Sequence, residues 1–212
     1  MSAAGKITAA AFRKCFAEVM RGVKGVELAK QYTSHPHRTR IMLNESGVLA
    51  ETCKRLTMKS SSLEYKREVY TLDAVMMSGT DLIFPDSRPD SSGARLWYPS
   101  KLDVLIEHEN GERLEEEMWK LLFWRADLKV LIGYDWCDDD KSLPIREQWR
   151  DKKLGWLRKM LRAVNADGSE NSEYLVLIGN RKTYSSEDAV AWRWCLLNEP
   201  GTDFTSIGDH DG

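Results

Sequence analysis

The sequence predicts an α/β protein in which helices flank a mixed β-sheet. Two short apolar segments, LKVLIGY at 128–134 and EYLVLIG at 173–179, have the length and composition of buried strands. Longer segments with helical spacing separate them, and this alternation favours parallel strands joined by crossover helices. The 212 residues suit one domain. We expect it to span 1–200, with a polar C-terminal tail at 201–212.

Two helices are expected at the start of the chain. Apolar residues recur at helical spacing through 6–30. A second helix is predicted over 44–58, with Asn44 as its N-cap. Its spacing places Glu45 on the same face as Val48, so a carboxylate would lie among core positions.

The next segments predict an antiparallel hairpin. Residues 68–77 (EVYTLDAVMM) are rich in β-forming side chains and are expected to form one strand with Asp73 at its middle. Residues 78–95 have the glycine, proline and serine content of a long connection. The chain returns as a second strand at 95–109, which the Asn-Gly pair at 110–111 ends.

In the second half of the chain, segments with the apolar spacing of helices alternate with short apolar segments typical of strands. We expect helices at 112–125 and 145–163, and strands at 128–134, 173–179 and 190–197. The strand before 112–125 and the strand after it would then form a parallel pair with a right-handed crossover.

Carboxylates gather on one face of the predicted hairpin. Period two places Asp103, Glu107 and Glu109 on the same face of their strand, and pairing with 68–77 would bring Asp73 close to them. Like charges at this separation repel unless a cation neutralises them, and Mg²⁺ takes oxygen ligands. One alternative is that Glu107 and Glu109 only lie on a solvent-facing side of the strand. Asp103 also competes with Asp73 for the role of first ligand.

The segments VYTLDAV, LDVLIEHEN, EEEMWKLL and LKVLIGY together resemble the core of the PD-(D/E)XK, or restriction-endonuclease-like, nuclease superfamily. The resemblance covers roughly 44–134. It implies a restriction-endonuclease-like fold, with Asp73 and Glu107 as ligands of Mg²⁺ or Mn²⁺ and Glu45 as a further metal-binding acid. Glu109 stands where the family usually has lysine, although some members use Glu-x-Glu.

Lysine for such a site could come from the following helix. Lys120 is placed to lean toward the carboxylates, although a surface ion pair with Glu117 would also explain it. Asp73, Glu107, Glu109 and Lys120 are therefore the expected catalytic residues. The resemblance implies a metal-dependent endonuclease that hydrolyses phosphodiester bonds of nucleic acid, most often DNA.

Two other functions stay open from the sequence. The chain could be a catalytically degenerate nuclease fold that acts as a nucleic-acid- or protein-binding, regulatory module, because the strand lysine is missing. It could instead be a protein-interaction domain that uses its tryptophan-rich helices, since eight tryptophans are present.

A formal net charge of −2 gives no general attraction to nucleic acid, so binding would need a local basic patch. The stretch 146–162 offers one, and the expected contacts are Arg146, Arg150, Lys152 and Lys153. A solvated helix face is the competing interpretation. A homodimer would suit cutting of both strands of a duplex, but no sequence feature marks an interface.

The location predicted from the sequence is cytoplasmic, with no membrane partner. No signal-peptide pattern opens the chain, and no apolar run approaches the length that spans a bilayer. The four cysteines form no CxxC pair, which argues against a zinc site and for reduced thiols.

Overall fold

The computed structural model describes residues 6–23, 40–57, 63–69, 71–78, 102–109, 113–135, 143–165, 171–179, 192–198 and 204–207. The predicted connection at 78–95 lies almost entirely outside these residues. None of the helices in the described ranges is long and apolar enough to cross a membrane.

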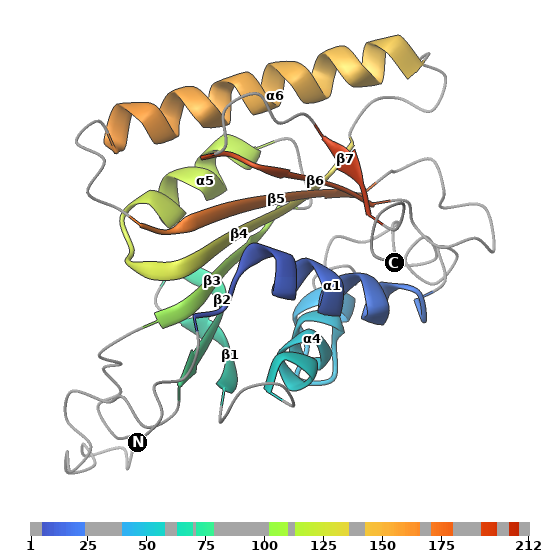
Figure 1. Ribbon diagram of the computed structural model, residues 1–212, viewed down its shortest axis with the longest axis vertical. Coiled ribbons are helices and arrows are strands. Elements are labelled where there is room, and N and C mark those ends of the chain that lie inside the picture. Colours follow the sequence, from blue (N-terminus) through green and yellow to red (C-terminus); the bar gives the residue numbers. More distant parts are fainter. Residues whose placement is uncertain are drawn as a thin grey trace.

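The described strands form one mixed seven-stranded sheet, arranged in space in the same order as in the chain (Figure 1). The strands are β1 (Leu63–Val69), β2 (Leu72–Ser78), β3 (Leu102–His108), β4 (Ala126–Tyr134), β5 (Glu173–Gly179), β6 (Trp192–Leu196) and β7 (Thr205–Ser206). β1, β2 and β3 form an antiparallel meander, and β3, β4 and β5 are parallel. β6 and β7 then extend the sheet antiparallel. The predicted mixed sheet is confirmed.

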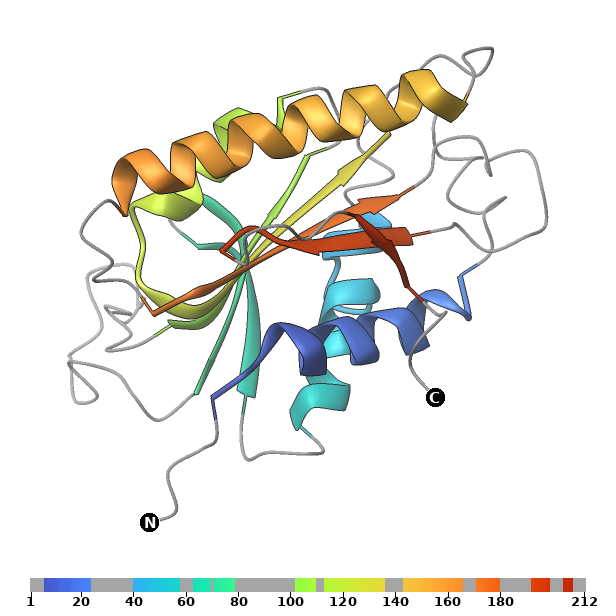
Figure 2. The ribbon, with the colours of Figure 1, turned by 45° about the horizontal axis from the view of Figure 1, so that its top comes forward.

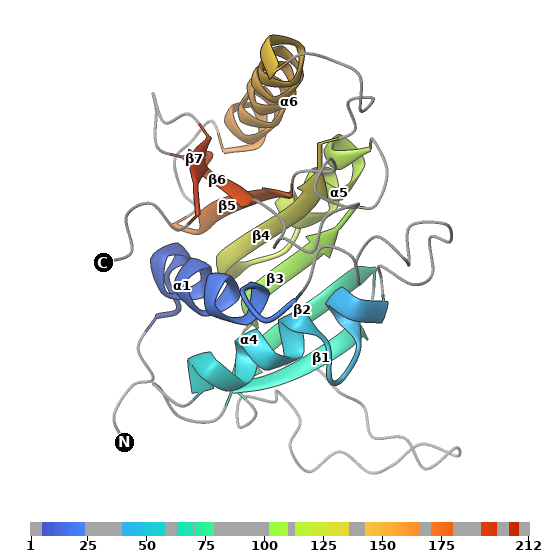
Figure 3. The same ribbon diagram turned by 90° about the vertical axis from the view of Figure 1, so that its right-hand side faces the viewer.

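Helices cover both faces of this sheet. They are α1 (Ala9–Met20), α4 (Val48–Thr57), α5 (Leu114–Leu122) and α6 (Leu143–Val164). α1 and α4 lie on one face, and α5 and α6 lie on the other (Figures 1 and 3). Figure 2 shows α6 lying along the outside of the sheet as the longest helix of its layer.

Alternating side chains of the strands supply two separate cores. Ile106 and Ile132 pack toward α1 and α4, whereas Leu105 and Leu131 pack toward α5 and α6. All seven residues of β3 are consequently buried. A polar side chain on β3 therefore lies inside the protein, so the alternative of a solvent-facing strand is wrong for Glu107.

Close packing fixes the position of α5 over the sheet. The buried face of the helix consists of Leu114, Met118, Leu121 and Leu122. Its first turn contacts β4 at Gly133, where a Cβ atom would collide with the side chain of Leu114. This contact holds α5 against β4 and leaves the flank with Glu117 and Lys120 facing β3.

Several predicted boundaries were wrong. Residues 40–43 form a short helical segment of their own, and a turn over 44–47 follows it. α4 therefore begins at Val48 rather than at Asn44. The α1 helix starts at Ala9, where the Thr8 side chain accepts a hydrogen bond from the Ala11 N–H at 3.2 Å and caps the helix. In the predicted tail, β7 pairs with β6, so this part of 201–212 belongs to the sheet.

The strand expected over 68–77 is in fact parts of two strands. β1 ends at Val69, and β2 begins at Leu72. β1 (LEYKREV) alternates half-buried and exposed residues at the edge of the sheet. Because many of its side chains are charged, its sequence lacks the apolar pattern that predicts a strand.

Candidate metal-binding site

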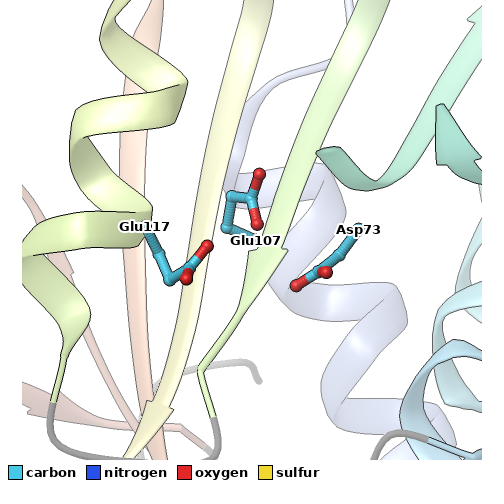
Figure 4. A group of neighbouring side chains, drawn as sticks. All are labelled: Asp73, Glu107 and Glu117. Atoms are coloured by element: carbon cyan, nitrogen blue, oxygen red, sulfur yellow. The ribbon is translucent and has the colours of Figure 1, made fainter. Parts of the chain in front are cut away.

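Three carboxylates from three different elements converge on the α5 face of the sheet. Asp73 of β2, Glu107 of β3 and Glu117 of α5 each offer an oxygen within 4.8 Å of the other two. Figure 4 shows the three side chains pointing toward one another. The antiparallel pairing of β2 with β3 brings the two strand acids together, because Ala74 pairs with Ile106, the residue before Glu107.

Glu107 is the most enclosed of the three acids. Its side chain is 0% exposed, and its Oε1 atom has no hydrogen-bond partner among the described residues. Burial raises the pKa of Glu107 to about 10, and the neighbouring Glu117 and Asp73 carboxylates contribute to this increase. Without a bound cation, Glu107 therefore holds a proton at neutral pH.

Asp73 is half-buried, and β3 fixes its orientation. Its Oδ2 atom accepts a hydrogen bond from the backbone N–H of His108 at 2.8 Å. Burial raises the pKa of Asp73, and this hydrogen bond opposes the increase. The backbone contact turns the carboxylate toward the strand that carries Glu107.

Lys120 supplies a positive charge between two of the carboxylates. Its Nζ atom donates to Glu107 Oε2 at 3.3 Å and also contacts Glu117 Oε2. Burial lowers the pKa of Lys120, but the Glu117 and Glu107 carboxylates outweigh this effect and raise it overall. Lys120 is therefore an ammonium at neutral pH and cannot act as a proton acceptor there.

The charges of this group suit a divalent cation. When ionised, three carboxylates and one ammonium leave two negative charges, since −3 + 1 = −2. Oxygen ligands of this type are those that Mg²⁺ and Mn²⁺ prefer. The bare Oε1 atom of the buried Glu107 offers a ligand position that no described residue occupies.

The other expected acids lie apart from this group. Glu109 follows the end of β3 and is half-buried, but it is not among the three converging carboxylates. Asp103 is buried near the start of β3 and is also outside the group. Glu45 is exposed in the turn before α4, where it lines a surface cavity with Tyr65 and Arg67. This cavity is on the α4 side of the sheet, so Glu45 does not join Asp73 and Glu107.

The basic residues expected to contact nucleic acid divide between the two sides of α6. Arg150 is buried and pairs with Asp135 at 3.2 Å. Lys153 pairs with Glu115 of α5 at 2.7 Å. Lys152 is exposed, whereas the side chain of Arg146 lies outside the described part of the structure. Arg150 and Lys153 thus serve contacts within the protein.

Sequence reasoning missed Glu117 as a member of the acidic group. Three consecutive glutamates, 115–117, occupy the first turn of α5. Only the rotation of the helix on the sheet decides which of them faces Glu107. The one feature of the sequence that pointed to Glu117 was its position three residues before Lys120.

Comparisons of the chain with protein-family models, with curated proteins and with solved structures give no match.

Proposed function

We propose that the protein is a metal-dependent nuclease that hydrolyses phosphodiester bonds of nucleic acid at the Asp73–Glu107–Glu117 site. The observation that carries the proposal is the fully buried Glu107, which has one bare oxygen and faces two further carboxylates. Burying a carboxyl oxygen without a hydrogen-bond partner is unfavourable, even though the other oxygen of Glu107 accepts from Lys120. A cation bound between the three carboxylates would account for this arrangement.

The order of elements around the site also supports the proposal. A meander of three strands is followed by a helix and by a strand parallel to the third. The resemblance implies a helix, a hairpin that bears the acids, a helix and a further strand; α4, the β2–β3 hairpin, α5 and β4 follow this order, with β1 as an additional strand. Membership of this nuclease family is part of the proposal.

Each residue of the site has a distinct role in the proposed reaction. Asp73, Glu107 and Glu117 would hold Mg²⁺ or Mn²⁺, which supplies an acidified water and stabilises charge on the phosphate. Lys120, as an ammonium, would stabilise negative charge that develops on the phosphate oxygens. Glu109, which lies after the end of β3 and outside the group of three carboxylates, has no role in the proposed reaction.

The competing function is a catalytically inactive module that keeps the fold for binding. The missing strand lysine at Glu109 favours that alternative. The position of Lys120 argues against it, because its ammonium lies 3.3 Å from Glu107 and so provides the positive charge from the helix. We therefore favour hydrolysis over binding alone.

Metal binding and hydrolysis should be measured on the same set of variants. Calorimetry with Mn²⁺ would compare the wild type with Asp73→Asn and Glu117→Gln, and with Glu116→Gln as the matched control, because Glu116 is exposed on the same helix. We expect both site variants to weaken binding at least tenfold and the control to bind like the wild type.

Hydrolysis would be tested with pooled single- and double-stranded DNA and RNA in the presence of Mn²⁺. Lys120→Met should keep metal binding but lose about 100-fold in rate, as is typical when a group that stabilises transition-state charge is removed. If the wild type binds no Mn²⁺ at millimolar concentration, the proposal is wrong. If it binds the ion but cleaves none of the pools, the binding module is favoured.

A further inference from the structure

The part of α6 that follows its last acidic residue, the exposed Asp151, carries an excess of positive charge. From 152 to 164 the helix has five basic residues and no acidic one. Lys152, Lys159 and Arg162 are exposed, and none of them forms an ion pair with another residue that the structure describes. Arg150 and Lys153, in contrast, are both paired with acids, and the Lys153 ammonium also lies 5.2 Å from the centre of the Trp156 ring.

An exposed tryptophan lies in the middle of this positive stripe. Helical spacing places 152, 156, 159 and 162 along one side of α6, over about 15 Å of helix length. The indole of Trp156 is 43% exposed. The Lys152 ammonium lies 4.8 Å from the centre of that ring. A positive charge and a flat aromatic surface are therefore available at the same place.

Gly155 leaves the surface beside Trp156 open. Glycine is unfavourable inside a helix, and here no packing contact requires it, since a Cβ at Gly155 would meet no atom within 4 Å. Because Gly155 has no side chain, a planar group can approach the helix next to the indole.

We infer that this stripe, Lys152–Gly155–Trp156–Lys159–Arg162, binds single-stranded nucleic acid. An unpaired base can stack on Trp156, while phosphates of the strand contact the exposed Lys152, Lys159 and Arg162. Bases of an intact duplex stack on each other and cannot use the indole in this way. The inference does not require hydrolysis, and it goes beyond the metal site because it assigns a second surface and the strandedness of its ligand.

A membrane surface fits this face less well. The large apolar side chains of α6, Leu154, Leu157 and Leu161, are buried against the sheet. Three of the four residues that lie three or four positions from Trp156 are lysines (152, 153 and 159), and the fourth, Met160, is half-buried. An acidic protein would use the cations but would leave the open space at Gly155 unexplained.

The test measures binding of fluorescein-labelled oligo(dT) and oligo(rU) by anisotropy, using the full chain in EDTA so that no metal-dependent cleavage occurs. Trp156→Ala should weaken binding about tenfold. The matched control is Trp119→Ala, because Trp119 of α5 is 50% exposed and lies outside the stripe. Gly155→Leu should weaken binding to a similar extent, although leucine favours the helix.

Salt dependence tests the role of the cations separately. Each phosphate contact with a single strand contributes about 0.7 to the slope of log affinity against log salt. Lys152→Gln with Lys159→Gln should therefore lower the slope by about 1.4. The control pair, Lys54→Gln with Lys66→Gln, removes two exposed cations of α4 and β1 and should leave it unchanged.

Any of three results with oligonucleotides would overturn the inference. They are absence of oligonucleotide binding at low salt, equal binding by Trp156→Ala and the wild type, and equally tight binding of a blunt duplex. Binding of phosphatidylserine vesicles without binding of oligonucleotides would also overturn it, in favour of a membrane. Because the assay contains no metal, failure of the nuclease proposal would leave its outcome unaffected.

Discussion

Replacing Glu107 with glutamine should stabilise the metal-free protein at neutral pH. Glutamine keeps the shape of the side chain and an acceptor for Lys120, but it removes a carboxyl group that cannot ionise easily in its buried position. The wild-type side chain has a pKa of about 10 in the folded protein, against 4.5 for an ordinary glutamate. The folded state consequently binds more protons than the unfolded state between these values, and stability falls as the pH rises through that window.

The pKa difference sets the size of the effect. At pH ~7.5 the unfolded glutamate is about 3 pH units above its pKa, which corresponds to an upper limit of about 4 kcal/mol at 1.36 kcal/mol per unit. At pH ~5 the same calculation gives about 1 kcal/mol. Glu107→Gln should therefore be more stable than the wild type at pH ~7.5, and most of the difference should disappear at pH ~5.

Urea unfolding in EDTA, followed by tryptophan fluorescence at the two pH values, would measure this difference. Glu116→Gln is the control, because Glu116 is exposed and its replacement should not change the pH dependence. A Mn²⁺ concentration of 100 times its Kd should offset most of this difference, since it stabilises the wild type by about 2.7 kcal/mol against the upper limit of about 4 kcal/mol. The reasoning is refuted if the variant is no more stable than the wild type at pH ~7.5, or if the difference persists unchanged at pH ~5.

Three further predictions follow from the same contacts. The affinity for Mn²⁺ should rise with pH, by up to about tenfold per unit, because the ion must displace the proton of Glu107; calorimetry in buffers of different ionisation enthalpy would detect the released proton. Asp135→Asn should lower the free energy of unfolding by about 3–5 kcal/mol, since it leaves the buried Arg150 guanidinium with only the exposed Glu147, 4.0 Å away, as an ionic partner; a loss below 1 kcal/mol in urea would contradict this. Gly155→Ala should raise the free energy of unfolding by about 1 kcal/mol and Tm by about 2–4 °C, because its Cβ meets no neighbour; calorimetric melting would show a decrease if the site is constrained.

The fold was predictable where apolar patterns are strong. β5 has the bounds expected from its sequence, and β4 and α6 lie within two residues of theirs. β4 and β5 are continuous apolar runs buried on both faces, whereas α6 buries the side that carries Leu154, Leu157 and Leu161. β1 and β7 were missed for the opposite reason, because they lie at the edges of the sheet and their side chains are largely polar. Tertiary pairing, and not local composition, makes them strands.

Of the candidate site, the sequence predicted only the two carboxylates that lie on strands. The period of two and the antiparallel pairing are enough to bring Asp73 and Glu107 together. The position of Glu45 could not be inferred, because the turn before α4 shifts it out of the helix and onto the exposed surface. Glu117 required the rotation of α5, which depends on contacts between residues distant in the sequence.

The dependence on α5 has a consequence for how this site is held together. In the nuclease family that the proposal invokes, the lysine usually lies on the same strand as the glutamate, so strand geometry alone fixes their separation. Here Lys120 and Glu117 come from α5, whose distance from the sheet depends on the contact of Leu114 with Gly133. Packing on β4 therefore sets the geometry of the charges around Glu107. Substitutions at this contact should disturb the site without replacing any of its ligands.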